Sequence, residues 1–399
     1  MLSVNEAIAS LLDGSRRLVG SEEIDLISAL GRTLATDIIA TIDVPPADNS
    51  AMDGYALRHG DWQDAETGLP LSQRIAAGSV PQALEPGTAA RIFTGAEVPA
   101  GADTVVMQEH CEASAKDASK SGVRIFRLPA LGANIRPRGQ DITTGQKMLA
   151  VGHRMRAQDM GLLASQGIGK IQVYKRLKVA ILSTGDELVE PGKELQGGQI
   201  YNSNRFTMLG QLAAWGFEVV DLGVARDEPE AIRELFESAA AKADVILSSG
   251  GVSVGEEDYV KDVVESLGSI DLWKIAIKPG KPFAFGQVNG TPFLGLPGNP
   301  VSVFVTMLII GRPYLFRCQG IADTTVHAMQ HIACFENRGS PRENYLRVRL
   351  GENGLEPFPS QSSGVLLSTS WGDGLVRQHA NEDIEQGDNV EFLPWLVLN

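Results

Sequence analysis

Short apolar runs alternate with amphipathic stretches between residues 175 and 323. Three of the apolar runs predict strands, at Val179–Leu182, Glu218–Gly223 and Val245–Leu247. The stretches between them carry apolar residues at helical spacing, which predicts helices at about 204–215 and from Pro229 onward. Strands and helices that alternate in this way predict a mainly parallel sheet covered by helices.

Two glycine-rich turns in this segment connect a predicted strand to a predicted helix. They are Ser248–Gly255 and Pro297–Pro300, and the second precedes an apolar helix at Val301–Ile310. Such a turn exposes backbone N–H groups at the positive end of a helix, where a phosphate or similar anion binds. Glycines that merely form a turn explain one such loop equally well. Two loops with the cationic segment Lys278–Pro282 between them favour a site for a phosphorylated or oxyanionic substrate.

Polar side chains follow the predicted strand ends. They are Asp186, Glu187, Asp227, Ser253, Asp258 and Lys278. Ligands of parallel sheets bind at the C-terminal ends of the strands, so these residues predict a binding site at that edge.

The remaining chain shows different patterns. A capping box at Ser3–Glu6 predicts an N-terminal helix, and the spacing of Ile27, Leu30 and Leu34 predicts a second one. From Leu57 to Asp141 the runs are short and separated by Gly and Pro, which predicts a small all-β domain. The chain after residue 324 is again rich in predicted strands.

We therefore expect an α/β plus β fold of several domains. A discontinuous mixed domain comprises 1–47 and 142–174, and an inserted β-rich domain comprises 48–141. The central α/β domain comprises 175–323, and a C-terminal β domain, barrel-like in form, comprises 324–399.

Two loops of the predicted β-rich insert carry charged residues. The turn-like stretch Asp48–Ala56 is either a surface turn or a loop that presents Asp53 to a cleft. The stretch Asn134–Asp141 contains Arg136 and Arg138, which are either an anion site or part of a solvated, ion-paired loop.

Composition narrows the function. The chain has 399 residues and a net charge of −14, which disfavours general binding to nucleic acid or to an acidic membrane surface. Its three cysteines form no Cys-x-x-Cys, so neither a disulfide framework nor a zinc site is expected, and a reduced cytoplasmic setting fits. No signal peptide is recognisable, and the longest apolar run, Val301–Ile310, is too short to span a bilayer.

Five stretches occur in an order that resembles one known family. They are Asp48–Ala56, Ser183–Leu188, Ser248–Gly255, Lys278–Pro282 and Leu296–Ser302. Together they are similar to the MoeA family of molybdopterin molybdenumtransferases, which includes the E domain of gephyrin, and the likeness covers essentially the whole chain. The resemblance implies a homodimeric transferase that inserts molybdenum from molybdate into adenylylated molybdopterin and releases AMP, with Mg²⁺. It also implies that the protein's partners are molybdopterin adenylyltransferase and proteins that assemble molybdoenzymes.

The resemblance also implies site residues. The catalytic residues it implies are Asp53, Glu187, Asp227, Asp258, Lys274 and Lys278, of which Glu187, Asp227 and Asp258 are the metal ligands. The substrate-binding residues it implies are Thr94, Arg136, Arg138, Asp141, Ser183, Thr184, Gly250, Gly251, Ser253, Lys281, Pro297, Gly298, Asn299, Pro300 and Ser368. Carboxylates are hard oxygen ligands suited to Mg²⁺, and the lysines would neutralise phosphate or molybdate.

Three alternatives share this scaffold. A non-catalytic molybdopterin carrier or scaffold would bind the pterin without releasing AMP. A nucleotidyl transferase would turn over ATP. The third alternative is an enzyme that inserts tungstate in place of molybdate, and no residue in this sequence distinguishes the two oxyanions.

Overall fold

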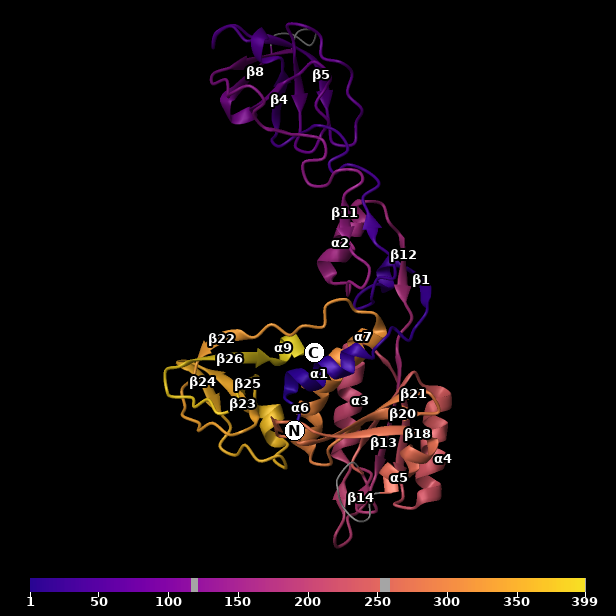
Figure 1. Cartoon of the computed structure of the whole chain (residues 1–399). Coiled ribbons are helices and arrows are strands. Elements are labelled where there is room, and N and C mark those ends of the chain that lie inside the picture. The colour runs from indigo at the N-terminus through magenta and orange to yellow at the C-terminus, as the bar shows by residue number, and fades with distance from the viewer. Residues whose placement is uncertain (116–120, 252–258, 399) are drawn as a thin grey trace. The chain divides into compact units, whose positions relative to one another are not determined.

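The computed structural model describes residues 1–115, 121–251 and 259–398, and the chain divides into two compact units (Figure 1). Unit 1 comprises Met1–Thr36, Val151–Ala157 and Lys170–Asn399. Unit 2 comprises Asp37–Ala150 and Gln158–Gly169. The expectation of several domains that combine mixed sheets with helices is confirmed, whereas the four-part division stays a prediction.

The α/β sheet of unit 1 has six strands. In spatial order they are β16 (Glu218–Ala225), β13 (Lys178–Thr184), β17 (Val245–Ser249), β21 (Thr291–Leu296), β20 (Pro282–Val288) and β18 (Gly268–Lys274). β13 pairs in parallel with β16 and β17, and β17 pairs in parallel with β21. β20 is antiparallel to both of its neighbours, so β18 runs in the same direction as β21. All strands except β20 therefore end at one edge of the sheet.

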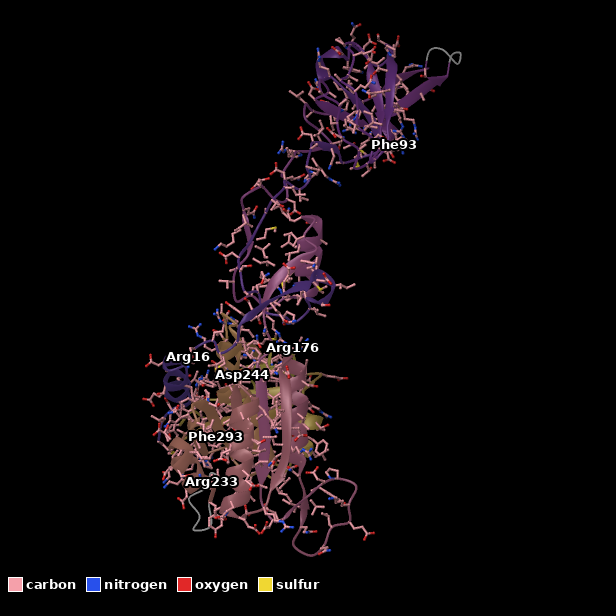
Figure 2. All side chains as sticks on the ribbon, turned by 90° about the vertical axis from the view of Figure 1, so that its right-hand side faces the viewer. Arg16, Phe93, Arg176, Arg233, Asp244 and Phe293 are labelled. Carbon is pink, nitrogen blue, oxygen red and sulfur yellow. The ribbon has the colours of Figure 1, made fainter. Side chains whose placement is uncertain are left out.

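Helices cover both faces of this sheet, so β13 buries side chains on both sides. Val179 and Ile181 belong to the core beneath α3 (Ser203–Trp215). Ala180 and Leu182 belong to the core beneath α4 (Pro229–Lys242) and α5 (Tyr259–Leu267). On that second face, Phe236 packs edge to face against Phe293, with ring centroids 5.3 Å apart; Phe293 is labelled in Figure 2.

Local sequence explains where these elements begin and end. α4 begins at Pro229, whose fixed φ suits the first turn and whose missing N–H is not needed there. α3 ends at Gly216, which adopts a left-handed φ of 86°. Asn289 and Gly290, with φ of 48° and 82°, form the tight turn between β20 and β21. The strands and helices predicted between residues 175 and 247 are confirmed, and β18 begins directly after α5.

One prediction here was wrong in length. The apolar run at Val301–Ile310 is only part of a continuous helical stretch, formed by α6 (Pro300–Thr306), a π-helical segment (Met307–Gly311) and α7 (Arg312–Gln319). Among the described residues, Pro300–Gln319 is the one helical stretch long and apolar enough to cross a membrane. However, 89% of its most apolar part is buried inside the protein. Such burial is typical of a core helix.

The N-terminal part of unit 1 contains a second wrong prediction. α1 (Val4–Asp13) forms with the expected capping box between Ser3 and Glu6. No α-helix forms around Ile27, however: β1 (Ser21–Asp25) pairs with β12 (Lys170–Tyr174), and a single turn of 3₁₀ helix, η1 (Leu26–Ser28), follows. Ile27 is 86% exposed, so the helical spacing was coincidental.

The C-terminal part of unit 1 is a second sheet. Its strands, in spatial order, are β19 (Ile277–Lys278), β23 (Glu343–Gly351), β25 (Gly374–Gln378), β26 (Asn389–Pro394) and β22 (Met329–Ile332), and β24 (Gly354–Pro357) pairs with β23. Ala333, just after β22, bridges Leu355 of β24, which brings the two ends of the sheet together. The short helices α8 (Leu367–Trp371) and α9 (Trp395–Leu398) interrupt the β-rich pattern. β14 (Leu188–Val189) and β15 (Ile200–Tyr201) form a separate small pair.

Unit 2 is β-rich, while the inserted domain at 48–141 stays a prediction. Its main sheet has the order β7 (Thr104–Met107), β4 (Gly54–Leu57), β6 (Ala89–Ile92), β5 (Leu69–Ile75), β9 (Ser121–Ile125) and β8 (Cys111–Ala115). Smaller elements are the pairs β2 (Ile38–Ile39) with β11 (Lys147–Leu149) and β3 (Asn49–Ser50) with β10 (Ile135–Arg136), the turns η2 (His59–Asp61) and η3 (Gln108–His110), and α2 (Ala157–Ser165).

Candidate functional site

The ends of three parallel strands bring the first predicted site residues of unit 1 together. Ser183 of β13 and Ser249 of β17 share a hydrogen bond, with 3.1 Å between their Oγ atoms. The backbone N–H of Asp186 donates to Asp227 Oδ2 at 3.3 Å, and the N–H of Asp227 donates to Asp186 Oδ1 at 3.2 Å. This reciprocal pair holds two carboxylates side by side at the end of the sheet.

The acidic residues at this edge supply oxygen ligands. Glu187 is exposed, and its carboxylate folds back over Gly185: a Cβ at Gly185 would lie 2.6 Å from Glu187 Oε2. Asp258 and Ser253 lie outside the described residues. Among the residues that are described, no group of three or more His, Cys, Asp or Glu side chains is arranged to hold a metal ion. Mg²⁺ usually takes only one or two protein carboxylates together with water and substrate phosphates, so the Asp186–Asp227 pair fits that mode.

The first glycine turn is shaped by close packing. Gly250 and Gly251 have left-handed φ of 86° and 67°. A Cβ at Gly251 would lie 2.3 Å from Val260 Cγ2, so no other residue fits there without displacing α5. The N–H of Gly250 donates to Leu296 O at 3.2 Å, which joins this turn to the second one.

The second turn, Pro297–Pro300, is held from two sides. Asn204 of α3 donates from Nδ2 to Gly298 O at 2.8 Å. Val301, in the first turn of α6, donates its N–H to Ser363 O at 3.0 Å. Pro297 is buried, while Gly298 and Asn299 are exposed. The turn therefore presents an exposed backbone surface from a fixed position.

The lysine segment packs beside the same helix. Lys278 is half-buried and lies opposite Asn344 in the parallel pairing of β19 with β23. Gly280 has a φ of 108° and lies against α6, where an added Cβ would be 2.3 Å from Thr306 Cγ2. Lys274 ends β18 at the same edge of the sheet, opposite Pro282. Lys274 and Lys281 are exposed.

A buried arginine joins this group, and sequence reasoning missed it. Arg347 of β23 has no exposed surface; it donates from Nε to Ser368 Oγ at 3.1 Å and from Nη2 to Ser362 O at 3.2 Å. Burial lowers its pKa to about 10. The predicted residue Ser368 is itself fully buried, and its hydroxyl donates to Val365 O at 2.6 Å. Because Ser363 accepts the bond from α6, the Ser362–Ser363 backbone connects Arg347 to the second turn.

An open cleft of about 800 Å³ lies next to the Asp186–Asp227 pair. Its lining includes Asp186, Arg226, Lys193, Glu190 and Arg205. Arg205 donates to Asp221 from Nε at 2.9 Å and from Nη2 at 2.7 Å, and it forms an ion pair with Glu190. These bonds fix one wall of a polar cleft that is large enough for a nucleotide-sized ligand.

Unit 2 carries the other predicted residues, and it brings Asp53 and Thr94 together. The N–H and the Oγ1 of Thr94 both donate to Asp53 Oδ1 at 2.8 Å. These hydrogen bonds, the backbone one foremost, lower the pKa of Asp53 below its ordinary value, and the charge of Arg91 adds to the effect. Asp53 is therefore an ionised acceptor at neutral pH.

The arginine loop of unit 2 is partly ion-paired. Arg138 donates from Nε to Asp43 Oδ2 at 2.5 Å, and its N–H donates to Asp48 Oδ1 at 2.7 Å. Hydrogen bonds from Thr144 and Arg138 lower the pKa of Asp43. Arg136 lies exposed in β10, and Asp141 is exposed with its N–H bonded to Val44 O at 2.9 Å. The ion-paired interpretation therefore describes Arg138, and Arg136 is the more available cation of the two.

Comparison with known proteins agrees with this arrangement. Residues 2–167 match the family described as MoeA N-terminal region (domain I and II), residues 180–317 match the probable molybdopterin binding domain, and residues 336–395 match the MoeA C-terminal region (domain IV). The chain is 44% identical to the molybdopterin molybdenumtransferase of Haemophilus influenzae over 80% of this chain and 78% of the relative. It is 40% identical to the corresponding protein of Nostoc over 89% and 84%.

A solved structure is similar over almost the whole chain. The molybdopterin biosynthesis MoeA protein of Pyrococcus horikoshii OT3 has a TM-score of 0.85 and 28% identity, and the match covers 98% of this chain and 99% of that one. The α/β sheet with its polar edge, the matched molybdopterin binding domain and this solved structure together place the chain in the class of molybdopterin biosynthesis proteins. Within that class, this chain belongs to the MoeA family.

Proposed function

We propose that this chain is a molybdenum insertase: it takes molybdate and adenylylated molybdopterin, places molybdenum on the dithiolene of the pterin and releases AMP. The observation that carries the proposal is the cationic edge of unit 1. There the Lys278–Lys281 segment packs against α6 through Gly280, and the Ser362–Ser363 backbone links the exposed Pro297–Pro300 turn to the buried Arg347. Such a group suits a tetrahedral oxyanion, because ammonium and backbone N–H groups donate hydrogen bonds to it and a buried guanidinium adds positive charge nearby.

Each part of this edge has a distinct role in the proposal. Lys278 and Arg347 offset the charge of molybdate, and the Pro297–Pro300 turn orients it. The first turn, at Gly250 and Gly251, permits close approach of the pterin phosphate because glycine exposes the backbone. Lys274 and Lys281 add positive charge at the rim.

The anhydride of the substrate lies between its pterin phosphate and AMP, and we place it near Asp186 and Asp227. Mg²⁺ bound there, with Glu187 and Asp258 as further carboxylates, would neutralise the phosphates while the anhydride P–O bond breaks. The adenylate half would then occupy the cleft of about 800 Å³ beside Asp186. In unit 2, the ionised Asp53 serves as a hydrogen-bond acceptor rather than as a proton donor.

Further parts of the proposal follow from the family. We propose a homodimer in the cytoplasm that receives its substrate from molybdopterin adenylyltransferase and passes its product to proteins that assemble molybdoenzymes. The three cysteines are free, which suits a reducing compartment.

The test supplies the purified full chain with adenylylated molybdopterin, Mg²⁺ and molybdate. AMP release that requires molybdate, together with reconstitution of a molybdenum-free apoenzyme, is the expected result. Tight pterin binding without AMP release would favour the carrier alternative, and ATP consumption with molybdopterin would favour adenylyl transfer. Comparing AMP release with tungstate and with molybdate tests which of the two oxyanions the protein prefers.

A further inference from the structure

Two arginines occupy neighbouring positions on one face of the unit 2 sheet. Arg74 of β5 lies directly opposite Arg91 of β6 in a parallel pair, and Arg91 lies opposite Tyr55 of β4. Like charges directly opposite each other on adjacent strands destabilise a sheet. This placement therefore requires a compensating interaction.

Part of that compensation comes from Phe93, which is labelled in Figure 2. The guanidinium carbon of Arg74 lies 4.6 Å from the centroid of the Phe93 ring, and that of Arg91 lies 4.5 Å from it. A cation over an aromatic face is attracted by the ring's quadrupole. One half-buried ring thus gathers two positive charges, but it supplies no negative charge.

The hydrogen-bond acceptors that Arg91 contacts carry no charge, although the charge of Arg91 acts on the nearby Asp53. Arg91 donates from Nη1 to Gly54 O at 2.8 Å and from Nη2 to Gln108 Oε1 at 2.7 Å, and both of these acceptors are uncharged. Among the residues that the structure describes, neither Arg74 nor Arg91 has a carboxylate oxygen within ion-pair distance. Arg124 of the same sheet provides the contrast: it lies over Phe126 at 5.8 Å and pairs with Glu112 at 3.4 Å.

The arginine pair lies beside the Asp53–Thr94 contact. Arg91 bonds Gly54 O, and Gly54 follows Asp53 in the chain; Phe93 precedes Thr94. Asp53 directly precedes β4, and Phe93 directly follows β6. Phe93 contacts both arginines, and the charge of Arg91 acts on Asp53, so Asp53 lies beside the arginine pair.

We propose that Arg74 and Arg91 bind the phosphate groups of an organic diphosphate, with Phe93 holding the two guanidinium groups in place. A planar guanidinium matches two phosphate oxygens at once, and two such groups side by side suit a diphosphate better than a single phosphate. Because we place the anhydride of the adenylylated pterin near Asp186 and Asp227 in unit 1, the site at Arg74 and Arg91 takes a second, separate organic diphosphate. Inorganic pyrophosphate is sufficient to test it.

The test measures the rate at which phenylglyoxal modifies each arginine of the full chain, with peptides quantified by mass spectrometry. Pyrophosphate at about ten times its Kd should slow the modification of Arg74 about tenfold. Arg124 is the internal control, and its rate should not change, because Glu112 already occupies its guanidinium. Equal rates for Arg74 with and without pyrophosphate would overturn the proposal.

A variant provides a second readout. Arg74→Gln should raise the Kd for pyrophosphate about tenfold, equivalent to ~1.4 kcal/mol. Arg124→Gln, the matched control, should leave that Kd unchanged. A purely structural stack predicts instead a lower melting temperature for Arg74→Gln with an unaltered Kd, and that result would refute the phosphate site. If the wild-type chain releases no AMP but pyrophosphate still protects Arg74, the insertase function is refuted and the phosphate site is not.

Discussion

Gly280 offers a direct test of how tightly the lysine segment is held against α6. It lies between Lys278 and Lys281, has a φ of 108°, and an added Cβ would sit 2.3 Å from Thr306 Cγ2. Thr306 is fully buried, and its hydroxyl donates to Ser302 O at 2.7 Å, so its methyl group cannot turn away freely. Gly280→Ala therefore forces either the lysine segment or α6 to move.

The expected cost has two parts. A non-glycine residue at such a φ costs about 1–3 kcal/mol, and one extra carbon in a packed site costs about 1–3 kcal/mol. Together they lower the stability of unit 1 by about 2–6 kcal/mol. For domains of about 150–250 residues each kcal/mol shifts Tm by about 2–4 °C, so calorimetry should show a fall of about 4–24 °C.

Two further variants separate the parts. Gly290→Ala places a side chain at a φ of 82° with no heavy atom within 4 Å, so it measures the backbone cost alone. Adding Thr306→Ser to Gly280→Ala removes the clashing methyl and keeps the hydroxyl, so it should recover the packing part. Molybdate binding should weaken in Gly280→Ala and improve again in the double variant, because the position of Lys278 depends on this contact.

The reasoning fails if Gly280→Ala melts within about 2 °C of Gly290→Ala, since the clash would then cost less than about 1 kcal/mol. It also fails if Thr306→Ser lowers Tm further rather than restoring it.

Three other expectations concern separate contacts. Thr94→Val should raise the pKa of Asp53 only part of the way to its ordinary value, because the hydrogen bond from the Thr94 backbone N–H, the larger cause of the shift, remains. In the wild type, the stability gained from the Asp53 carboxylate is lost as the pH falls from 3.8 through the lowered pKa. An NMR titration of the carboxyl group should show the variant protonating at higher pH than the wild type. Asn204→Ala removes the donor to Gly298 O and should cost about 1 kcal/mol in the calorimetric transition of unit 1 and weaken molybdate binding; unchanged binding would separate this anchor from the site. Cys318 is buried with its pKa raised to about 12, and it should resist iodoacetamide at pH 8 in the native protein and react fully after denaturation, as peptide mapping would show.

Much of the α/β part of unit 1 was predictable because its signals are local. β13 buries alternate residues on both faces, so it reads as a continuous apolar run. Pro229 and Gly216 mark a helix start and a helix end by backbone geometry alone. The strand-end rule then identified Asp186 and Asp227 as neighbours, although they are far apart in the chain.

The failures came from non-local contacts. Residues 21–25 form a strand because they pair with Lys170–Tyr174, a partner that no local pattern reveals, and the turn after that strand leaves Ile27 exposed. Arg347 and Arg349 alternate in sequence like any exposed pair, yet the first is fully buried against Ser368 and the second forms a surface ion pair with Glu356. Only the tertiary fold distinguishes them.

Crystals of the full chain soaked in molybdate and measured at the molybdenum absorption edge test the central claim most directly. The account predicts an anomalous peak within hydrogen-bond reach of Lys278 and the Pro297–Pro300 turn, close to Arg347. A well-occupied peak at another place in the chain, with none at this edge of the sheet, would contradict it.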